Sequence, residues 1–218
     1  MKIKGAIFDM DGTLVDSLML WEVLWDAFSE RFCDGKEFRP SVHDDKAVRT
    51  MLLRDAMQMI HEHYGFGRDG QELLDTANAI MADFYKNRVE LKVGVREFLE
   101  HLYANGVKMC VASATAPDLI NLAVEHCGLG KYFLKIFSCG ELGLGKDKPD
   151  IYLLARDFLQ TPLEKTCVFE DSVVAIETAA KIGMPVVGIW DKHNSDQDKI
   201  QAIATHYIAC GETLLKLI

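Results

Sequence analysis

The stretch Ile7-Phe8-Asp9-Met10-Asp11-Gly12-Thr13-Leu14-Val15-Asp16-Ser17 decides the fold of this chain. Residues 3–8, which lead into the first aspartate, are rich in apolar and β-branched side chains and predict a strand that is buried on both faces. In open α/β sheets, ligands bind beyond the carboxyl ends of the strands. The carboxylates of Asp9 and Asp11 therefore predict a site for a divalent cation and a phosphate.

The hydrophobic pattern becomes helical after Ser17. Apolar residues then recur at the spacing of a single helix face, and the first such stripe consists of Trp21, Leu24, Trp25, Phe28 and Phe32. A second helix is predicted on the apolar positions Val48, Met51, Leu52, Ala56, Met59 and Ile60. A third is predicted from Leu74 through Tyr85. Residues 16–89 are therefore expected to form an all-helical block.

From residue 92 onward, predicted strands alternate with predicted helices. Strands are expected near residues 107–112, 136–139, 166–169, 186–189 and 207–209. This alternation predicts a Rossmann-like parallel sheet with helices on both faces. Since the helical block interrupts the series after its first strand, we expect an α/β core of residues 1–15 and 90–218 with an inserted cap of residues 16–89.

Composition narrows the class of protein. The 218 residues are 49% hydrophobic and 26% charged, as in ordinary globular proteins. The net charge of −9 argues against nucleic acid or an anionic membrane as a partner. No run approaches the roughly 20 apolar residues of a membrane span. The six cysteines lack C-x-x-C spacing, so free thiols and a cytoplasmic location are expected, whereas nothing indicates the oligomeric state.

Polar groups recur at the predicted strand ends: Asp9 and Asp11, Ser113, Lys146, and Glu170 and Asp171. Together with their flanking residues, this set resembles the haloacid dehalogenase-like hydrolase superfamily. The resemblance lies in residues 7–17, in Val111-Ala112-Ser113-Ala114-Thr115, in Gly145-Lys146-Asp147-Lys148-Pro149-Asp150-Ile151-Tyr152, and in Val168-Phe169-Glu170-Asp171-Ser172. The inserted helical block is similar to the C1 cap of that family.

The resemblance implies four catalytic residues. Asp9 would attack phosphorus and form an aspartyl-phosphate. Asp11 would protonate the leaving oxygen and later take a proton from water. Ser113 and Lys146 would bind phosphoryl oxygens, Lys146 by neutralising their charge. Gly12 and Ala114 are expected to complete the phosphate site.

The resemblance also implies Mg²⁺ as the cofactor. Asp9, the backbone carbonyl of Asp11, and Asp171 would supply ligands, with Glu170 in the coordination shell or just outside it. An acidic pair at the end of an apolar strand is otherwise hard to explain, because neighbouring like charges are unfavourable without a cation.

The expected function is hydrolysis of a small phosphorylated metabolite, with sugar phosphates as one candidate class. A sugar phosphate mutase is the alternative, because the Phe-Glu-Asp-Ser and Ala-Ser-Ala-Thr stretches resemble the β-phosphoglucomutase-like branch. Arg49 is expected near the place where that branch binds the non-reacting phosphate. Trp21 and Ala116, however, replace a histidine and a lysine of the branch, which favours hydrolysis.

Two further hypotheses about the function stay open at this point. Residues 140–146 satisfy the G-x-x-x-x-G-K pattern of a P-loop nucleotide hydrolase, but Asp147 stands where Ser or Thr would hold the metal. A catalytically inactive protein that binds a phosphorylated metabolite is the other alternative.

Overall fold

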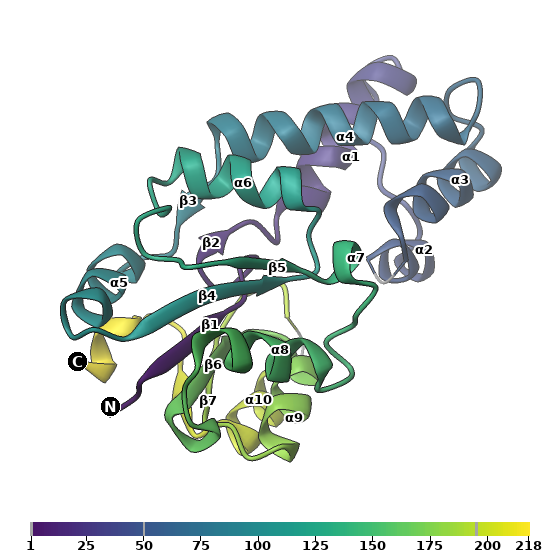
Figure 1. Ribbon diagram of the computed structural model, residues 1–218. Coiled ribbons are helices and arrows are strands. Elements are labelled where there is room, and N and C mark those ends of the chain that lie inside the picture. The colour runs from purple at the N-terminus through teal and green to yellow at the C-terminus, as the bar shows by residue number, and fades with distance from the viewer. Residues whose placement is uncertain (1, 50, 195) are drawn as a thin grey trace. The chain divides into compact units, whose positions relative to one another are not determined.

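The computed structural model describes residues 2–49, 51–194 and 196–218. The chain divides into two compact units (Figure 1). The α/β unit comprises Met1–Leu18 and Val89–Ile218, and the helical unit comprises Met19–Arg88.

A six-stranded sheet forms the centre of the α/β unit. Its strands are β1 (Gly5–Phe8), β4 (Lys108–Ser113), β5 (Ile136–Ser138), β6 (Thr166–Glu170), β7 (Val186–Ile189) and β8 (His206–Ile208). They are ordered β5-β4-β1-β6-β7-β8, and every neighbouring pair is parallel. The predicted parallel α/β sheet is therefore confirmed. β1 lies between β4 and β6, which makes it a central strand.

Helices cover both faces of this sheet (Figure 1). They are α5 (Val95–Ala104), α6 (Pro117–His126), α7 (Cys139–Leu142), α8 (Asp150–Leu159), α9 (Val173–Lys181) and α10 (Gln197–Ile203), with short 3₁₀ helices at Leu163–Lys165 and Leu214–Leu217. Successive side chains of a strand point to opposite faces. Ile7 accordingly packs with residues of α8 and α9, whereas Phe8 stacks on Phe169 at 4.3 Å and meets Phe98 of α5 at 6.5 Å.

A second, two-stranded sheet lies where the chain leaves and re-enters the α/β unit. β2 (Val15–Asp16) pairs antiparallel with β3 (Glu90–Leu91). Just beyond β3, the backbone N–H of Lys92 donates to the carbonyl of Leu14 at 3.0 Å. The two chain segments that flank the helical unit are thus hydrogen-bonded to each other.

The helical unit contains α1 (Leu20–Phe32), α2 (Val42–Val48), α3 (Leu53–Tyr64) and α4 (Gly70–Asn87). Its aromatic core is built around Trp25, which is buried and meets Phe28 and Phe38 edge-on at 5.7 and 6.0 Å. The indole N–H of Trp25 donates to Asp45 at 3.1 Å. The buried polar end of this side chain is therefore satisfied.

The prediction of one continuous helix over residues 48–60 is wrong. The apolar positions from Val48 through Ile60 belong to two helices, because α2 ends at Val48 and α3 begins at Leu53. Leu52 has an extended backbone at the start of α3 and is 75% exposed, and Met51 is also exposed. These two residues matched the helical period without belonging to the buried face, which concealed the break.

None of the helices in the described part of the chain is long and apolar enough to cross a membrane. The predicted thiol state also holds, since all six cysteines are free and Cys110, Cys139 and Cys167 are buried.

The stacked pair at the sheet centre predicts a stability effect. Phe8→Ala is expected to lower the free energy of unfolding by about 3–5 kcal/mol, because it opens a cavity between two buried rings. Phe158→Ala is the control, since Phe158 is 45% exposed and its truncation should cost about 1 kcal/mol or less. Urea denaturation monitored by circular dichroism measures both losses, and similar values for the two variants would argue against this packing.

Candidate active site

The carboxyl ends of three adjacent strands bring the predicted residues together. Because β1 is paired with both β4 and β6, Asp9 directly follows the middle strand while Ser113 and Glu170 end its two neighbours. The backbone N–H of Asp9 donates to the carbonyl of Phe169 at 2.9 Å, which continues the ladder to the end of the sheet. The pairing of the three strands therefore fixes the backbone positions from which the side chains of Asp9, Ser113 and Glu170 project.

Lys146 joins two of the carboxylates. Its ammonium group donates to Asp9 Oδ1 and to Glu170 Oε1, the latter at 2.5 Å. The Lys146 side chain is 14% exposed, and those of Asp9 and Glu170 are 9% and 1% exposed. Lys146 is therefore a mostly buried cation between two acids.

Asp9, Glu170 and Asp171 form a buried acidic cluster in which the candidate ligand oxygens lie within 4.8 Å of one another. Burial raises the pKa of Asp9 to about 8, with Glu170 and Asp11 adding to the rise and Lys146 opposing it. Burial, reinforced by Glu170 and Asp9, also holds the pKa of Asp171 well above its usual range. The single ammonium group does not balance the three acids.

Lys146 itself stays charged in this environment. Burial acts to lower its pKa, but the carboxylates of Asp9 and Glu170 outweigh burial and hold the pKa well above the ordinary value. A cluster of carboxylate oxygens that still lacks positive charge suits a hard divalent cation. The residues present therefore fit Mg²⁺.

Glu170 is held by the protein through both carboxylate oxygens. While Oε1 accepts from Lys146, Oε2 accepts from the backbone N–H groups of Asp171 and Ser172 at 3.0 and 2.9 Å. Thr13 Oγ1 lies 3.3 Å from Asp171 Oδ1, to which it donates. Glu170 thus organises the loop after β6, and Asp171 is linked to the loop after β1.

Asp11 has a different environment. Its Oδ1 accepts from the hydroxyl of Ser17 at 2.6 Å and its Oδ2 accepts from the hydroxyl of Thr115 at 2.7 Å. The backbone N–H of Thr115 in turn donates to Ser113 Oγ at 3.1 Å. Two hydroxyls therefore hold the Asp11 carboxylate.

Sequence reasoning gave no role to Thr13 or Ser17, and it did not predict that Thr115 binds Asp11. Thr13 and Ser17 lie in the opening stretch and Thr115 in the Ser-Ala-Thr segment, so their positions near the site were visible. Their bonds to Asp11 and Asp171 join segments up to 158 residues apart, and no local pattern encodes such pairings.

Gly12 packs against the loop after β6, called here the acidic loop because it carries Asp171 directly after Glu170. Its φ of +74° lies in the left-handed region, and a Cβ at this position would lie 2.6 Å from Asp171 Oδ2. Both the backbone conformation and the close approach require glycine.

Two further residues were predicted to bind phosphate, Ala114 and Arg49. Ala114 is exposed just beyond the end of β4. Arg49 belongs to the helical unit, where its Nε donates to Asp45 Oδ2 at 2.8 Å and its guanidinium lies 5.8 Å from the Trp21 ring centroid. The predicted roles of both residues toward a phosphate stay predictions.

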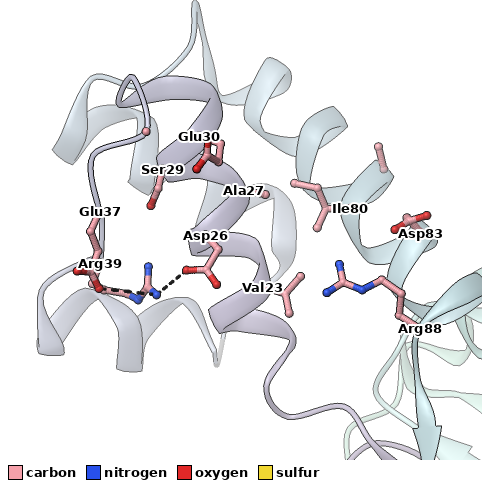
Figure 2. A pocket seen from close by; sticks show the side chains of 12 residues that line it. Val23, Asp26, Ala27, Ser29, Glu30, Glu37, Arg39, Ile80, Asp83 and Arg88 are labelled. Atoms are coloured by element: carbon pink, nitrogen blue, oxygen red, sulfur yellow. Dashed lines mark hydrogen bonds and ion pairs between the residues drawn. The ribbon is translucent and has the colours of Figure 1, made fainter.

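A separate pocket of about 640 Å³ lies within the helical unit (Figure 2). Its charged lining consists of four acids and two arginines, namely Asp26, Glu30, Glu37, Asp83, Arg39 and Arg88. Arg39 is already paired with Asp26 at 2.5 Å. The acidic excess disfavours a phosphate there, so this pocket is not a candidate for the phosphoryl site.

The chain belongs to the haloacid dehalogenase-like hydrolase family, whose sequence profile matches residues 3–183. The family expected from the strand-end motifs is thereby confirmed. One relative is a Drosophila melanogaster protein named "Probable pseudouridine-5'-phosphatase", which is 30% identical over 90% of this chain and 85% of its own length. Another is the "Phosphorylated carbohydrates phosphatase" of Thermotoga maritima, which is 24% identical over 97% of both chains.

Solved structures are similar in fold. A Thermotoga maritima crystal structure described as a "putative beta-phosphoglucomutase" has a TM-score of 0.83 and 24% identity, and the match covers 99% of this chain and 98% of that chain. At this level of identity, the likeness supports the predicted fold class alone.

The close approach at Gly12 predicts that the site rejects a methyl group. Gly12→Ala is expected to lower phosphate release by about 100-fold or more, because the new Cβ displaces the Asp171 carboxylate. Gly106→Ala is the matched control, since its φ is +71° and nothing lies within 4 Å of the added Cβ. The control should lose about 1–2 kcal/mol of stability but keep its activity. Phosphate release and thermal unfolding measure the two effects, and an active Gly12→Ala would refute the close approach.

Proposed function

We propose that this protein is a Mg²⁺-dependent phosphatase that hydrolyses a small phosphomonoester through an aspartyl-phosphate on Asp9. The observation that carries the proposal is the buried Lys146 bridge between Asp9 and Glu170, with Asp171 beside it. A buried lysine and a surplus of acids at the ends of adjacent strands suit an anionic group that arrives together with a cation. Membership of a hydrolase family supports this assignment.

Asp9 is the proposed nucleophile. One of its oxygens attacks phosphorus, the bond to the leaving oxygen breaks, and the phosphoryl group becomes attached to the carboxylate. Water then cleaves this anhydride and restores Asp9. Lys146 holds Asp9 Oδ1 in place and neutralises charge on the phosphoryl oxygens during transfer.

Asp11 is the proposed general acid and base. It protonates the leaving oxygen in the first step and accepts a proton from the attacking water in the second. The hydroxyls of Ser17 and Thr115 orient its carboxylate while it changes protonation state. Asp9 and Asp11 thus have distinct environments, as their distinct roles require.

Mg²⁺ is the proposed cofactor, because hydrolases of this family generally use it and the acidic cluster fits it. Asp9, Asp171 and the carbonyl of Asp11 would hold the ion, with Glu170 in the shell or beside it. When bound, it supplies positive charge to the acidic cluster and to the substrate phosphate. We assign Gly12, Ser113 and Ala114 to the phosphate cradle next to the start of α6, where helix N–H groups favour an anion.

The substrate class is proposed from the relatives. Their names include a pseudouridine-5'-phosphatase and a phosphorylated carbohydrates phosphatase, which support a small phosphorylated metabolite. We propose that residues 16–89 act as a cap inserted into a core of residues 1–15 and 90–218, and that Arg49 contributes to substrate choice. A cytoplasmic location is proposed on the buried free thiols.

Mutase activity is the second candidate, because two solved structures of similar fold are described as β-phosphoglucomutases. Ala116 is the N-cap residue directly before α6 in this chain, where the mutase branch is expected to have a lysine. A panel of phosphorylated metabolites assayed for phosphate release, with glucose 1-phosphate isomerisation measured in parallel, distinguishes the two activities. Isomerisation that outpaces phosphate release would replace the phosphatase assignment with the mutase.

Removing the nucleophile or the metal should stop the reaction. Asp9→Asn is expected to lower phosphate release by about a thousandfold or more, because the amide cannot form the covalent intermediate. EDTA should abolish release, and added Mg²⁺ should restore it.

The matched control is Asp157→Asn, since the Asp157 side chain is 65% exposed on α8 and should not affect activity. Beryllium fluoride, which mimics the aspartyl-phosphate, should bind the unmodified protein and not Asp9→Asn. Full activity of Asp9→Asn or in EDTA would refute the mechanism. Absence of both turnover and beryllium fluoride binding would favour an inactive metabolite-binding protein.

A further inference from the structure

One peptide group in the acidic loop is held from both sides. The N–H of Ser172 donates to Glu170 Oε2 at 2.9 Å, and the carbonyl of Asp171, in the same peptide group, accepts from the side-chain amide of Asn194. A trans peptide is planar, with its N–H and C=O pointing in opposite directions. These two contacts therefore fix the rotation of that plane, which in turn sets the direction in which the Asp171 side chain leaves the backbone.

Asn194 comes from a distant segment, the loop between β7 and α10, and is itself fixed. Its Oδ1 accepts from the backbone N–H of Asp196 at 3.1 Å, and its own N–H donates to the carbonyl of Asp191 at 3.2 Å. The side-chain amide of Gln197 donates to the carbonyls of Asp191 and Asn194 at 2.9 and 3.1 Å. The amide that reaches Asp171 is thus held in one orientation.

Asp191 anchors this loop to the rest of the unit. It is 3% exposed, and its carboxylate accepts from the N–H of His193 at 2.9 Å and from the ammonium group of Lys92 at 2.6 Å. Lys92 also donates from its backbone N–H to Leu14 in the loop after β1. The segments that carry Asp9 and Asp171 are therefore both tied to Lys92, the second through Asp191 and Asn194.

We propose that Asn194 is a positioning residue that sets the affinity of the acidic cluster for its divalent cation. The proposal rests on the proposed function, because it takes the acidic cluster as a metal site. Asn194 acts through the backbone of Asp171, so it leaves Asp9 and Lys146 unchanged and affects how well the ligand oxygens converge. Groups that orient metal ligands in this way typically change metal affinity by about 10–100-fold when they are removed.

The experiment is a direct binding titration of the full chain with Mn²⁺, in which free Mn²⁺ is followed by electron paramagnetic resonance. Asn194→Ala is expected to weaken Mn²⁺ binding by about tenfold or more. In parallel, the Mg²⁺ concentration needed for half-maximal phosphate release should rise by a similar factor. Activity at saturating Mg²⁺ should recover to near the unmodified value, a split that a general loss of structure would not produce.

Asn105→Ala is the matched control. Asn105 also donates a side-chain amide to a backbone carbonyl, that of His101 at 2.8 Å, but it does so at the exposed end of α5. Both variants lose one amide–carbonyl hydrogen bond, and Asn194→Ala also loses the bond that its Oδ1 accepts from the Asp196 N–H. The melting temperature should therefore fall by no more than about 4 °C in Asn105→Ala and about 8 °C in Asn194→Ala. Only Asn194→Ala should lose Mn²⁺ affinity. Asn194→Ser, whose shorter side chain cannot span the gap to the carbonyl, gives a second test should the alanine variant fail to fold.

The outcomes separate the two proposals. Unchanged Mn²⁺ affinity in a folded Asn194 variant, or an equal loss in Asn105→Ala, overturns the role of Asn194 and leaves the phosphatase assignment intact. An unmodified protein that binds no Mn²⁺ and needs no metal for turnover overturns the metal site, and with it this inference.

Discussion

The balance of charge among Asp9, Lys146, Glu170 and Asp171 is the constraint on which the site depends. Buried ions are unfavourable unless partners and hydrogen bonds compensate for the water they lose. Here one ammonium group and two backbone N–H groups compensate Glu170 well, while the pKa values of Asp9 and Asp171 are raised. The folded chain therefore carries a local deficit of positive charge, which a divalent cation corrects.

The fold explains how such an unfavourable cluster is kept together. Phe8 and Phe169 are stacked in the middle of the sheet, one residue before Asp9 and Glu170 respectively. The apolar packing that stabilises β1 and β6 thus places Asp9 and Glu170 next to each other, where the two paired strands end. Hydrophobic burial on the strands offsets the cost of assembling like charges just beyond them.

The sequence predicted the parts of this arrangement that follow from local pattern. Alternating strands and helices predicted the parallel sheet, and polar residues at strand ends predicted that Asp9, Ser113 and Glu170 would meet. The pairings of Ser17 and Thr115 with Asp11, and of Asn194 with Asp171, depend on loop conformations that have no periodic signal. The break between α2 and α3 was missed for a related reason, because Leu52 is apolar but exposed.

The antiparallel pairing of β2 with β3 has a consequence for how the chain is organised. Paired strands lie about 5 Å apart, so the segment between them starts and finishes at nearly the same point. For the α/β unit, residues 19–88 are then equivalent to one long surface loop whose ends are already closed. Loop closure entropy depends only weakly on loop length, so the content of this insertion can change greatly in size with little thermodynamic effect on the sheet. Two strands of two residues each therefore let the insertion differ in length while the strand ends that carry Asp9 and Glu170 stay where they are.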